Sequence, residues 1–464
     1  MINLESNIYC KFLQCIGVKS MVVEISRNQA VVSNYFASKL PSNIRLSGIA
    51  YSNREDNVGL INGAIGNVSL PVHPKMYKRL VEIGTPEGGF ADGIVKYEET
   101  AGNPETQAAF KNILTQQGFD ASDLEVLITD GSSMAMEVAM LGICGEPGAD
   151  DKPLLMFDPS YTNFNSVAKR IGRKTITVKR TLNENGKFSF LDIKEIEETI
   201  LSERPNGILI IPYDNPTGQM YDKKTMVEIA KLCVKHNLWL LSDEAYRGLF
   251  YDKNREILSI WGITDKEVPG IEGRRISLET SSKVWNACGL RIGALITDSE
   301  IFHEKAVADY TTNLCTNALG QHVFGALAHE SREEILDWME NIQDHYRNIS
   351  YNMYKNFKAL NKNLIVSDPD SSIYTVIDVR NVVKPGFDSL DFVLYAAMHG
   401  KVNVNDEELT LLVVPLTGFY NEVPGEPNPG LTQLRISFCE PEDKLEKIPY
   451  VFVELLKQYE NQRV

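Results

Sequence analysis

Apolar runs recur through the middle of the chain and alternate with segments of helical spacing. Five runs have the length and bounding turn residues of buried strands: LEVLITD (124–130), KPLLMFDPSY (152–161), GILIIPYDNPTG (207–218), LWLLSDEAY (238–246) and RRISLETSSK (274–283). Residues 132–144 and 225–237 carry apolar residues at helical spacing. Apolar strands that alternate with helices predict a mostly parallel sheet covered on both faces.

The pattern changes after about residue 300. Residues 318–360 read as one or two long helices, and shorter strands are predicted at 372–379, 409–416 and 431–438. We therefore expect a large domain at 75–325. A smaller, discontinuous α/β domain would combine 326–464 with 1–74, which includes an N-terminal arm.

Composition narrows the partners that the protein can have. The 464 residues are 43% hydrophobic and 23% charged, as in ordinary globular proteins, and the net charge of -15 argues against a nucleic-acid partner. No apolar run reaches about 18 residues, and the first 21 residues lack the pattern of a signal peptide, so we expect no membrane span. The seven scattered cysteines form no CxxC pair, which favours a reducing cytoplasm over disulfides or a metal site.

Polar residues follow several of the predicted strands, where open α/β sheets bind their ligands. Ser132 and Ser133 begin a helix after Gly131, a place that suits a phosphate, although a plain helix cap is also common. Asn215, in the turn DNPTG, either caps that turn or hydrogen-bonds a ligand. Asp243 is either a helix cap or a buried carboxylate that faces a protonated heterocyclic nitrogen.

Lys283 ends a further strand at the same predicted edge. Most lysines are solvated surface residues, but desolvation or neighbouring cations would lower the pKa of this amine and allow it to form a Schiff base. Thr280 and Ser282 place hydroxyls beside it, and Arg291 a cation that suits a phosphate. Arg435 lies in the apolar strand LRISF, where it would pair with a protein acid or bind a ligand carboxylate. Together these groups are what pyridoxal phosphate requires.

Five segments of the chain carry a family resemblance. They are KYEETAGNPETQAAF (96–110), NPTG (215–218), SDEAY (242–246), SSK with the following RIG (281–293) and RISF (435–438). Their order and spacing, from about residue 40 to the C-terminus, resemble those of the class I/II aminotransferases, the aspartate aminotransferase group in particular. The resemblance implies the fold of the fold-type I pyridoxal-phosphate enzymes, with a mostly parallel seven-stranded sheet between helices and a smaller α/β domain.

The resemblance also assigns chemical roles. Lys283 would bind the cofactor covalently and later move the proton, and Asp243 would pair with the pyridine nitrogen. Asn215 and Tyr246 would bond the ring oxygen, and Tyr161 would stack on the ring.

The remaining assignments concern the phosphate, the substrate and the partner chain. The phosphate would be held by Ser132, Ser133, Thr280 and Arg291. Arg435, with Asn215, would bind the substrate, Arg435 through its α-carboxylate. Tyr97 would reach the phosphate of a neighbouring subunit, which implies a homodimer with shared active sites. No metal is implied.

Several positions depart from the family pattern. Tyr161 stands where many relatives have Trp or Phe, Thr280 where serine is usual, and Leu290 where an aromatic residue often precedes the arginine. The glycine near the substrate carboxylate is either Gly63 or Gly66. The stretch 416–430 is longer than expected and could shape the substrate pocket.

The function expected from these residues is an aminotransferase that moves an amino group from an L-amino acid to a 2-oxo acid, with aspartate and 2-oxoglutarate as the first pair. The same cofactor and fold also allow a lyase, by carbon–sulfur β-elimination or decarboxylation. A regulator that kept the fold would need a DNA-binding module, for which the first 40 residues are too short. A nicotinamide enzyme is disfavoured because no GxGxxG occurs. The sequence does not select the second cation that an acidic substrate requires.

Overall fold

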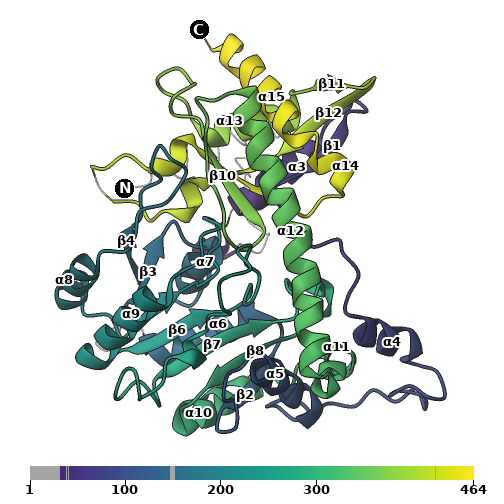
Figure 1. Cartoon of the computed structure of the whole chain (residues 1–464), viewed down its shortest axis with the longest axis vertical. Helices are drawn as coiled ribbons and strands as arrows, with labels where there is room; N and C mark the ends of the chain where they lie inside the picture. Colours follow the sequence, from purple (N-terminus) through teal and green to yellow (C-terminus); the bar gives the residue numbers. More distant parts are fainter. Residues whose placement is uncertain (1–31, 38, 40, 147–151, 424, 464) are drawn as a thin grey trace, which may run out of the picture.

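The computed structural model describes residues 32–37, 39, 41–146, 152–423 and 425–463. The expectation that no signal peptide is present falls on the first 21 residues, which lie outside this range. In the described part the chain forms a large sheet flanked by helices and a second group of smaller sheets and helices, as Figure 1 shows.

The large sheet has seven strands in the order β2-β8-β7-β6-β5-β3-β4. Their bounds are β2 (Glu125–Thr129), β3 (Leu154–Asp158), β4 (Thr175–Lys179), β5 (Gly207–Ile210), β6 (Trp239–Asp243), β7 (Arg275–Thr280) and β8 (Gly293–Thr297). Only β8 runs antiparallel to its neighbours, β2 and β7. The predicted mostly parallel, seven-stranded sheet is therefore confirmed.

Both faces of this sheet are covered by helices. Alternation along β2 sends Val126 and Ile128 into one apolar cluster and Leu127 into the other. The first cluster includes side chains of α5 (Pro104–Gln116), α8 (Ile193–Glu203) and α9 (Lys223–His236). The second includes those of α6 (Ser132–Cys144), α7 (Thr162–Arg170) and α10 (Glu300–Tyr310). The continuous apolar runs of the sequence follow from this two-sided burial.

The smaller sheets join the two ends of the chain. β1 (Gly59–Asn62) pairs in parallel with β12 (Glu407–Leu412), which pairs with β11 (Val402–Val404). The other sheet comprises β9 (Ile365–Val366), β10 (Tyr374–Asp378), β13 (Val414–Pro415) and β14 (Gln433–Ser437). This pairing agrees with a discontinuous small domain, whose bounds stay a prediction. Helices α3 (Asn43–Ser52), α13 (Ser389–Met398) and α15 (Ile448–Gln462) pack on these sheets. The terminal segments also form α2 (Asn34–Ala37) and α14 (Glu442–Leu445), whereas α4 (Pro74–Glu82) packs against residues 318–329 beside the large sheet.

The stretch 318–360 forms two helices, within the one or two predicted, whereas the apolar run 409–416 divides more finely than expected. Residues 318–360 form α11 (Ala318–Gly325) and α12 (Arg332–Leu360), and a capping box of Ser331 and Glu334 starts the second helix. The apolar run 409–416 belongs to two strands of different sheets, β12 and β13. Figure 1 shows α12 running from the large sheet to the smaller ones.

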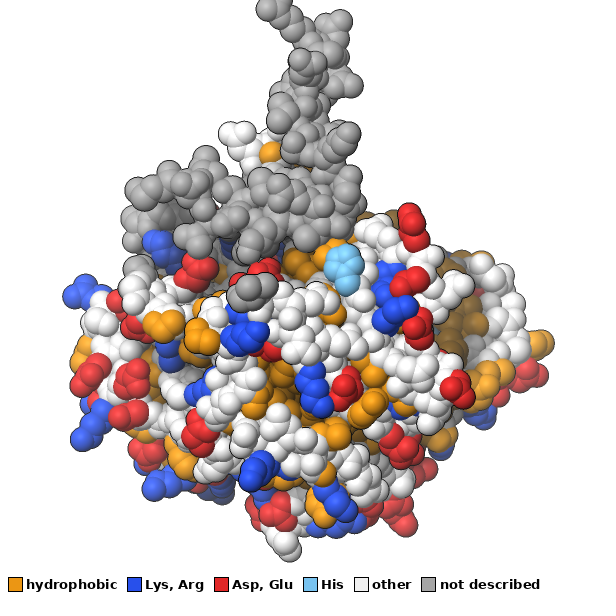
Figure 2. Space-filling view, turned by 90° about the horizontal axis from the view of Figure 1, so that it is seen from above, with side chains coloured by type: hydrophobic (Ala, Val, Ile, Leu, Met, Phe, Trp, Pro, Cys, Tyr) orange, Lys and Arg blue, Asp and Glu red, His pale blue; other side chains and the backbone are white. Residues whose placement is uncertain are grey.

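The surface carries charges of both signs. On the face drawn in Figure 2, acidic and basic side chains are interspersed. Within the described residues, no helix combines the length and the apolar character that crossing a bilayer requires.

A buried ion pair lies below the turn that carries Asn215. Arg180 Nη1 lies 2.8 Å from Asp214 Oδ2, and both side chains are at most 4% exposed. The same guanidinium donates to the backbone carbonyl oxygens of Phe157 and Pro159 at 3.1 and 2.7 Å. Arg180 therefore ties the ends of β3 and β5 together, which are also the segments that lead to Tyr161 and Asn215.

Removing this cation should strongly destabilise the protein. Arg180→Met leaves the Asp214 carboxylate buried without its partner, so we expect the free energy of unfolding to fall by about 3 to 5 kcal/mol. The neighbouring Lys179→Met breaks a more exposed pair with Glu426 and should cost at most about 1 kcal/mol. Urea denaturation of both variants measures the difference. Equal losses would contradict a central role for Arg180.

Candidate active site

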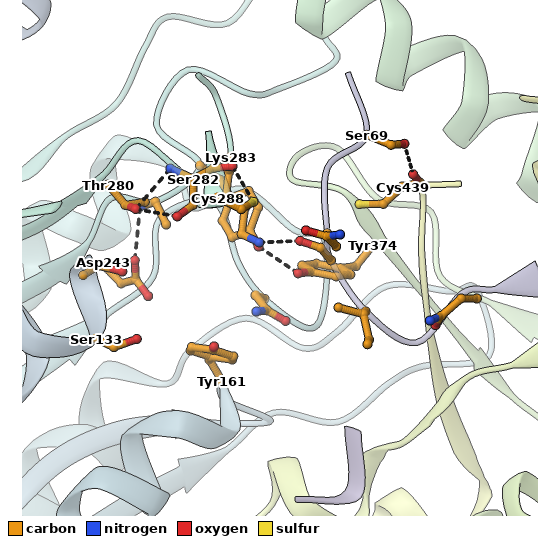
Figure 3. Close-up of a pocket in the computed structure, with 18 of the residues that line it drawn as sticks. Ser69, Ser133, Tyr161, Asp243, Thr280, Ser282, Lys283, Cys288, Tyr374 and Cys439 are labelled. Carbon is orange, nitrogen blue, oxygen red and sulfur yellow. Dashed lines mark hydrogen bonds between the residues drawn. The ribbon is translucent and has the colours of Figure 1, made fainter. Parts of the chain in front are cut away.

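The carboxyl ends of the strands meet at one cavity of about 720 Å³. Nine of the side chains predicted for the site line it: Ser132, Ser133, Tyr161, Asn215, Asp243, Tyr246, Thr280, Lys283 and Arg291. Figure 3 shows Lys283 and Tyr161 on opposite sides of this cavity, with Asp243 and Thr280 at one end. The parallel sheet is what brings these sequence-distant residues together.

The first turn of α6 provides an anion-binding end. Gly131 precedes it with φ 74°, and no acidic residue occupies the first turn. A Cβ at Gly131 would lie 2.4 Å from Arg291 Nη2, and one at Gly293 would lie 2.4 Å from the Ser132 backbone nitrogen. Both glycines therefore allow Arg291 and β8 to approach the positive end of the helix. This end suits a phosphate.

Two hydroxyls complete this end of the cavity. Thr280 Oγ1 donates to Ser282 Oγ at 2.9 Å, and Thr280 is buried at the end of β7. Thr280 therefore provides a hydroxyl at the position where serine is usual in the family pattern. Ser282, named in the sequence as a neighbouring hydroxyl, also lines the cavity.

Asp243 is a buried carboxylate at the end of β6. Its Oδ1 accepts a hydrogen bond from the Ala245 backbone N–H at 3.1 Å. Burial raises the pKa of Asp243 to about 6. Within the described residues no lysine, arginine or histidine forms an ion pair with it. Such a group is suited to a ligand that brings its own positive charge.

Lys283 lies at the centre of the cavity wall. Its Nζ donates to the Gly66 carbonyl oxygen at 2.5 Å. Burial lowers the pKa of this amine, but interactions with Tyr374 and the thiols of Cys288 and Cys439 outweigh it, so the pKa lies above its ordinary value. The lowered pKa expected from the sequence is therefore not found in the protein without ligand.

A pair of phenols joins the large sheet to the small one. The hydroxyls of Tyr246 and Tyr374 lie 2.8 Å apart, and Tyr374 also lines the cavity. A Cβ at Gly66 would lie 2.3 Å from the Tyr374 hydroxyl oxygen, so only glycine fits there. Of the two candidate glycines, Gly66 is therefore the one that lines the cavity. Tyr374 was not predicted from the sequence, because an aromatic residue in an apolar strand is typical of a core.

Arg435 is buried behind the cavity wall, against Asn215. Its Nη1 donates to Asn215 Oδ1 and its Nη2 to the Ala64 carbonyl oxygen, both at 2.9 Å, and its Cζ lies 4.2 Å from the centre of the Tyr374 ring. Its Nε is buried without a hydrogen-bond partner. Among the described residues no carboxylate pairs with it, so the alternative of an internal salt bridge is not observed.

Tyr97 does not reach this cavity within a single chain. Its side chain is 81% exposed and lines a separate hollow with Thr316 and Asn317. The predicted contact with a partner's phosphate therefore stays a prediction. Metal ligands are not assembled either, because the described residues contain no group of three or more His, Cys, Asp or Glu side chains placed to hold an ion.

Comparisons with known proteins identify the family of the chain. Residues 89–448 match the family described as aminotransferase class I and II. The chain is 25% identical to an aspartate aminotransferase of Sulfolobus acidocaldarius, over 73% of this chain and 79% of the relative.

Solved structures share the fold at lower identity. A mutant aspartate aminotransferase of Thermus thermophilus superposes with a TM-score of 0.75 at 19% identity, covering 92% of this chain and 100% of the other. An alanine aminotransferase of Pyrococcus furiosus reaches 0.73 at 22% identity, with the same coverage. The family match, which spans most of the chain, shows that this protein belongs to the class I and II aminotransferases, enzymes that use pyridoxal phosphate.

Proposed function

We propose that this protein moves the amino group of an L-amino acid to a 2-oxo acid at the cavity around Lys283, with aspartate and 2-oxoglutarate as the first pair to test. The observation that carries the proposal is the placement of a buried, cation-free carboxylate, a lysine amine and an anion-binding helix end around one cavity. Aminotransfer needs each of these groups.

The residues present fit pyridoxal phosphate. Gly131 and Gly293 leave room for Arg291 and the backbone at the positive end of α6, where Ser132, Ser133 and Thr280 would hold the phosphate. Asp243 would face the protonated ring nitrogen, which would serve as the cationic partner that this buried carboxylate lacks.

The other side chains would orient the ring and the substrate. Tyr161 would cover the ring, and Asn215 and Tyr246 would bond its oxygen. Arg435 has an unpaired Nε and no acidic partner among the described residues, which supports its proposed role in binding the α-carboxylate. Asn215 would then contact both the cofactor and the substrate-binding arginine.

The bound cofactor supplies an aldehyde that takes up the amino group and a ring that accepts electron density. Lys283 would be joined to the cofactor before the substrate arrives. Once displaced, its Nζ would take the proton from the substrate Cα and return it to the carbon on the cofactor side of the transferred nitrogen. Asp243 would hold the ring proton throughout. The hydrogen bond from Lys283 Nζ to the Gly66 carbonyl oxygen supports this role, because it leaves the amine free to turn within the cavity wall on the side of Gly66.

A homodimer with shared sites is part of this proposal. Large apolar side chains are exposed on α4 and in the segment just before Tyr97, namely Tyr77, Leu80, Val81, Ile94 and Val95. A second copy would cover them and place Tyr97 at the neighbouring cavity. The free thiols of the described cysteines support a cytoplasmic location, which we also propose.

Loss of the lysine amine should abolish the reaction. We expect Lys283→Ala and Lys283→Arg each to lower kcat by at least about 10³-fold, because the arginine keeps the charge but cannot act as the base. Single-turnover kinetics with the pre-bound cofactor measures the effect. Wild-type turnover in either variant would contradict the assignment.

Asp243→Asn should stabilise the protein without cofactor while removing its activity. Burial raises the pKa of Asp243 to about 6 from 3.8, so ionisation above pH 6 costs the folded wild type about 3 kcal/mol relative to a neutral side chain. The variant should therefore match wild type near pH 4 and exceed its free energy of unfolding by about 2 to 3 kcal/mol near pH 8.

Chemical denaturation of both proteins at the two pH values tests this expectation. Asp309→Asn, which removes an exposed charge from α10, is the matched control and should show no such change with pH. A pH-independent difference between wild type and Asp243→Asn would contradict the buried, unpaired carboxylate.

Shared sites can be tested by mixing inactive chains. Lys283→Ala and Tyr97→Ala should each be impaired, but a hybrid dimer would contain one site with both native residues. Partial recovery of activity after mixing, together with a sedimenting species of twice 52.1 kDa, is expected. No recovery in a verified hybrid would show that Tyr97 does not act across the interface.

A further inference from the structure

One wall of the cavity has no role in the chemistry described above. This wall is formed by segments that precede or follow the strands of the large sheet along the chain. It includes Arg45, Asn62, Asn67, Ser69 and Glu440. Because a class I and II aminotransferase is defined by its cofactor chemistry, this wall is where substrates of different side chains would be distinguished.

The cations at the cavity can be accounted for one by one. Lys283 and Arg291 line it and have proposed roles toward the cofactor, and Arg435 lies behind Asn215 for the α-carboxylate. Arg45 is the remaining cationic side chain in the described lining. The sequence left the second cation of an acidic substrate unselected, and within a single chain the described lining leaves Arg45 as the candidate.

Arg45 has no partner within the described part of the chain. Its side chain is exposed, and no hydrogen bond or ion pair involves it there. The acid on the same wall, Glu440, is already engaged: its Oε1 accepts from the Asn62 backbone N–H at 3.0 Å, and its Oε2 lies 3.5 Å from Lys444 Nζ. An arginine at a cavity mouth with its donors open is suited to an incoming anion.

The helix that carries Arg45 adds to this preference. α3 is fixed to the small sheets by Leu46 and Ala50, which are buried in one cluster with Leu390 and Phe419. Arg45 lies in the first turn, at the positive end of the helix, and no acidic residue occupies that turn. A cation there is unfavourable by a few tenths of a kcal/mol or more, and a bound anion would relieve it.

We infer that Arg45 binds the second carboxylate of the substrate, and that the enzyme therefore prefers dicarboxylic amino acids and 2-oxo acids. This inference rests on the proposed function. Arginine presents two parallel N–H donors to a carboxylate, which fixes both its position and its orientation. Amino acids with neutral side chains gain nothing from this contact.

Steady-state kinetics with several donors tests the inference. Wild type, Arg45→Gln and Arg45→Lys are compared with aspartate, glutamate, 2-aminoadipate and alanine, and the three acidic donors report which side-chain length reaches Arg45. Arg45→Gln should lower kcat/KM for the best acidic donor at least tenfold more than for alanine, and Arg45→Lys should lower it less. Lys362→Gln, an exposed cation far along the chain, should keep the wild-type ratio. An equal effect of Arg45→Gln on acidic donors and alanine would overturn the inference.

A binding measurement separates this inference from the proposed function. Calorimetry compares glutarate, which has two carboxylates, with butyrate, which has one. Arg45→Gln should weaken glutarate at least tenfold more than butyrate, and the wild-type preference should shrink as salt is raised. If no donor is transaminated but this selective loss is seen, the proposed function fails and the Arg45 site stands. If donors are transaminated but glutarate binds equally to wild type and Arg45→Gln, the site fails alone.

Discussion

The unpaired, buried carboxylate of Asp243 is the constraint on which the rest of the cavity depends. Burial raises the pKa of this carboxyl group to about 6, so its ionised form near neutral pH destabilises the folded protein. The sheet tolerates it because β6 ends there and the Ala245 N–H supplies one hydrogen bond. Around it, the positive end of α6 and Arg291 face the same cavity without neutralising it. The cavity thus holds negative and positive groups apart, as a zwitterionic ligand with a cationic ring and an anionic phosphate requires.

The residues at the strand ends could be predicted because their proximity follows from topology. Parallel strands place Asn215, Asp243 and Lys283 at one edge whatever the details of packing. Strands β4 (Thr175–Lys179) and β8 (Gly293–Thr297) were not predicted because each is a run of only five residues, and beside β8 only Arg291 was given a role. The break at Val413 between strands β12 and β13 was not predicted, because the two strands form one continuous apolar run in the sequence.

Other parts of the site depend on contacts that no local pattern reveals. Tyr374 meets Tyr246 only because the small sheet packs against the large one, and the same packing sets Arg435 beside Asn215. Arg45 reaches the cavity because α3 packs on the small sheets, through a cluster formed by residues from widely separated parts of the chain. The pKa of Lys283 was misjudged for a related reason, since phenols and thiols from several elements surround it. Long-range packing, rather than local propensity, decides these features.

Two solved structures that are 19% and 22% identical to this chain share its fold, although one is named an aspartate and the other an alanine aminotransferase. Separate walls of the cavity for the cofactor and for the substrate side chain would account for this difference. In the proposed function, the edge of the large sheet supplies the groups that would hold the cofactor. The opposite wall includes residues of the N-terminal and C-terminal segments, among them Arg45 and Glu440. Selectivity in this protein would therefore reside largely in α3 and in the segment after β14.

The most direct test is a crystal structure of the protein grown with pyridoxal phosphate. The account predicts electron density continuous with Lys283 Nζ, a phosphate at the first turn of α6 beside Arg291, and a ring nitrogen within hydrogen-bond distance of Asp243. A cofactor bound elsewhere, or one in this cavity whose ring nitrogen faces away from Asp243, would contradict it.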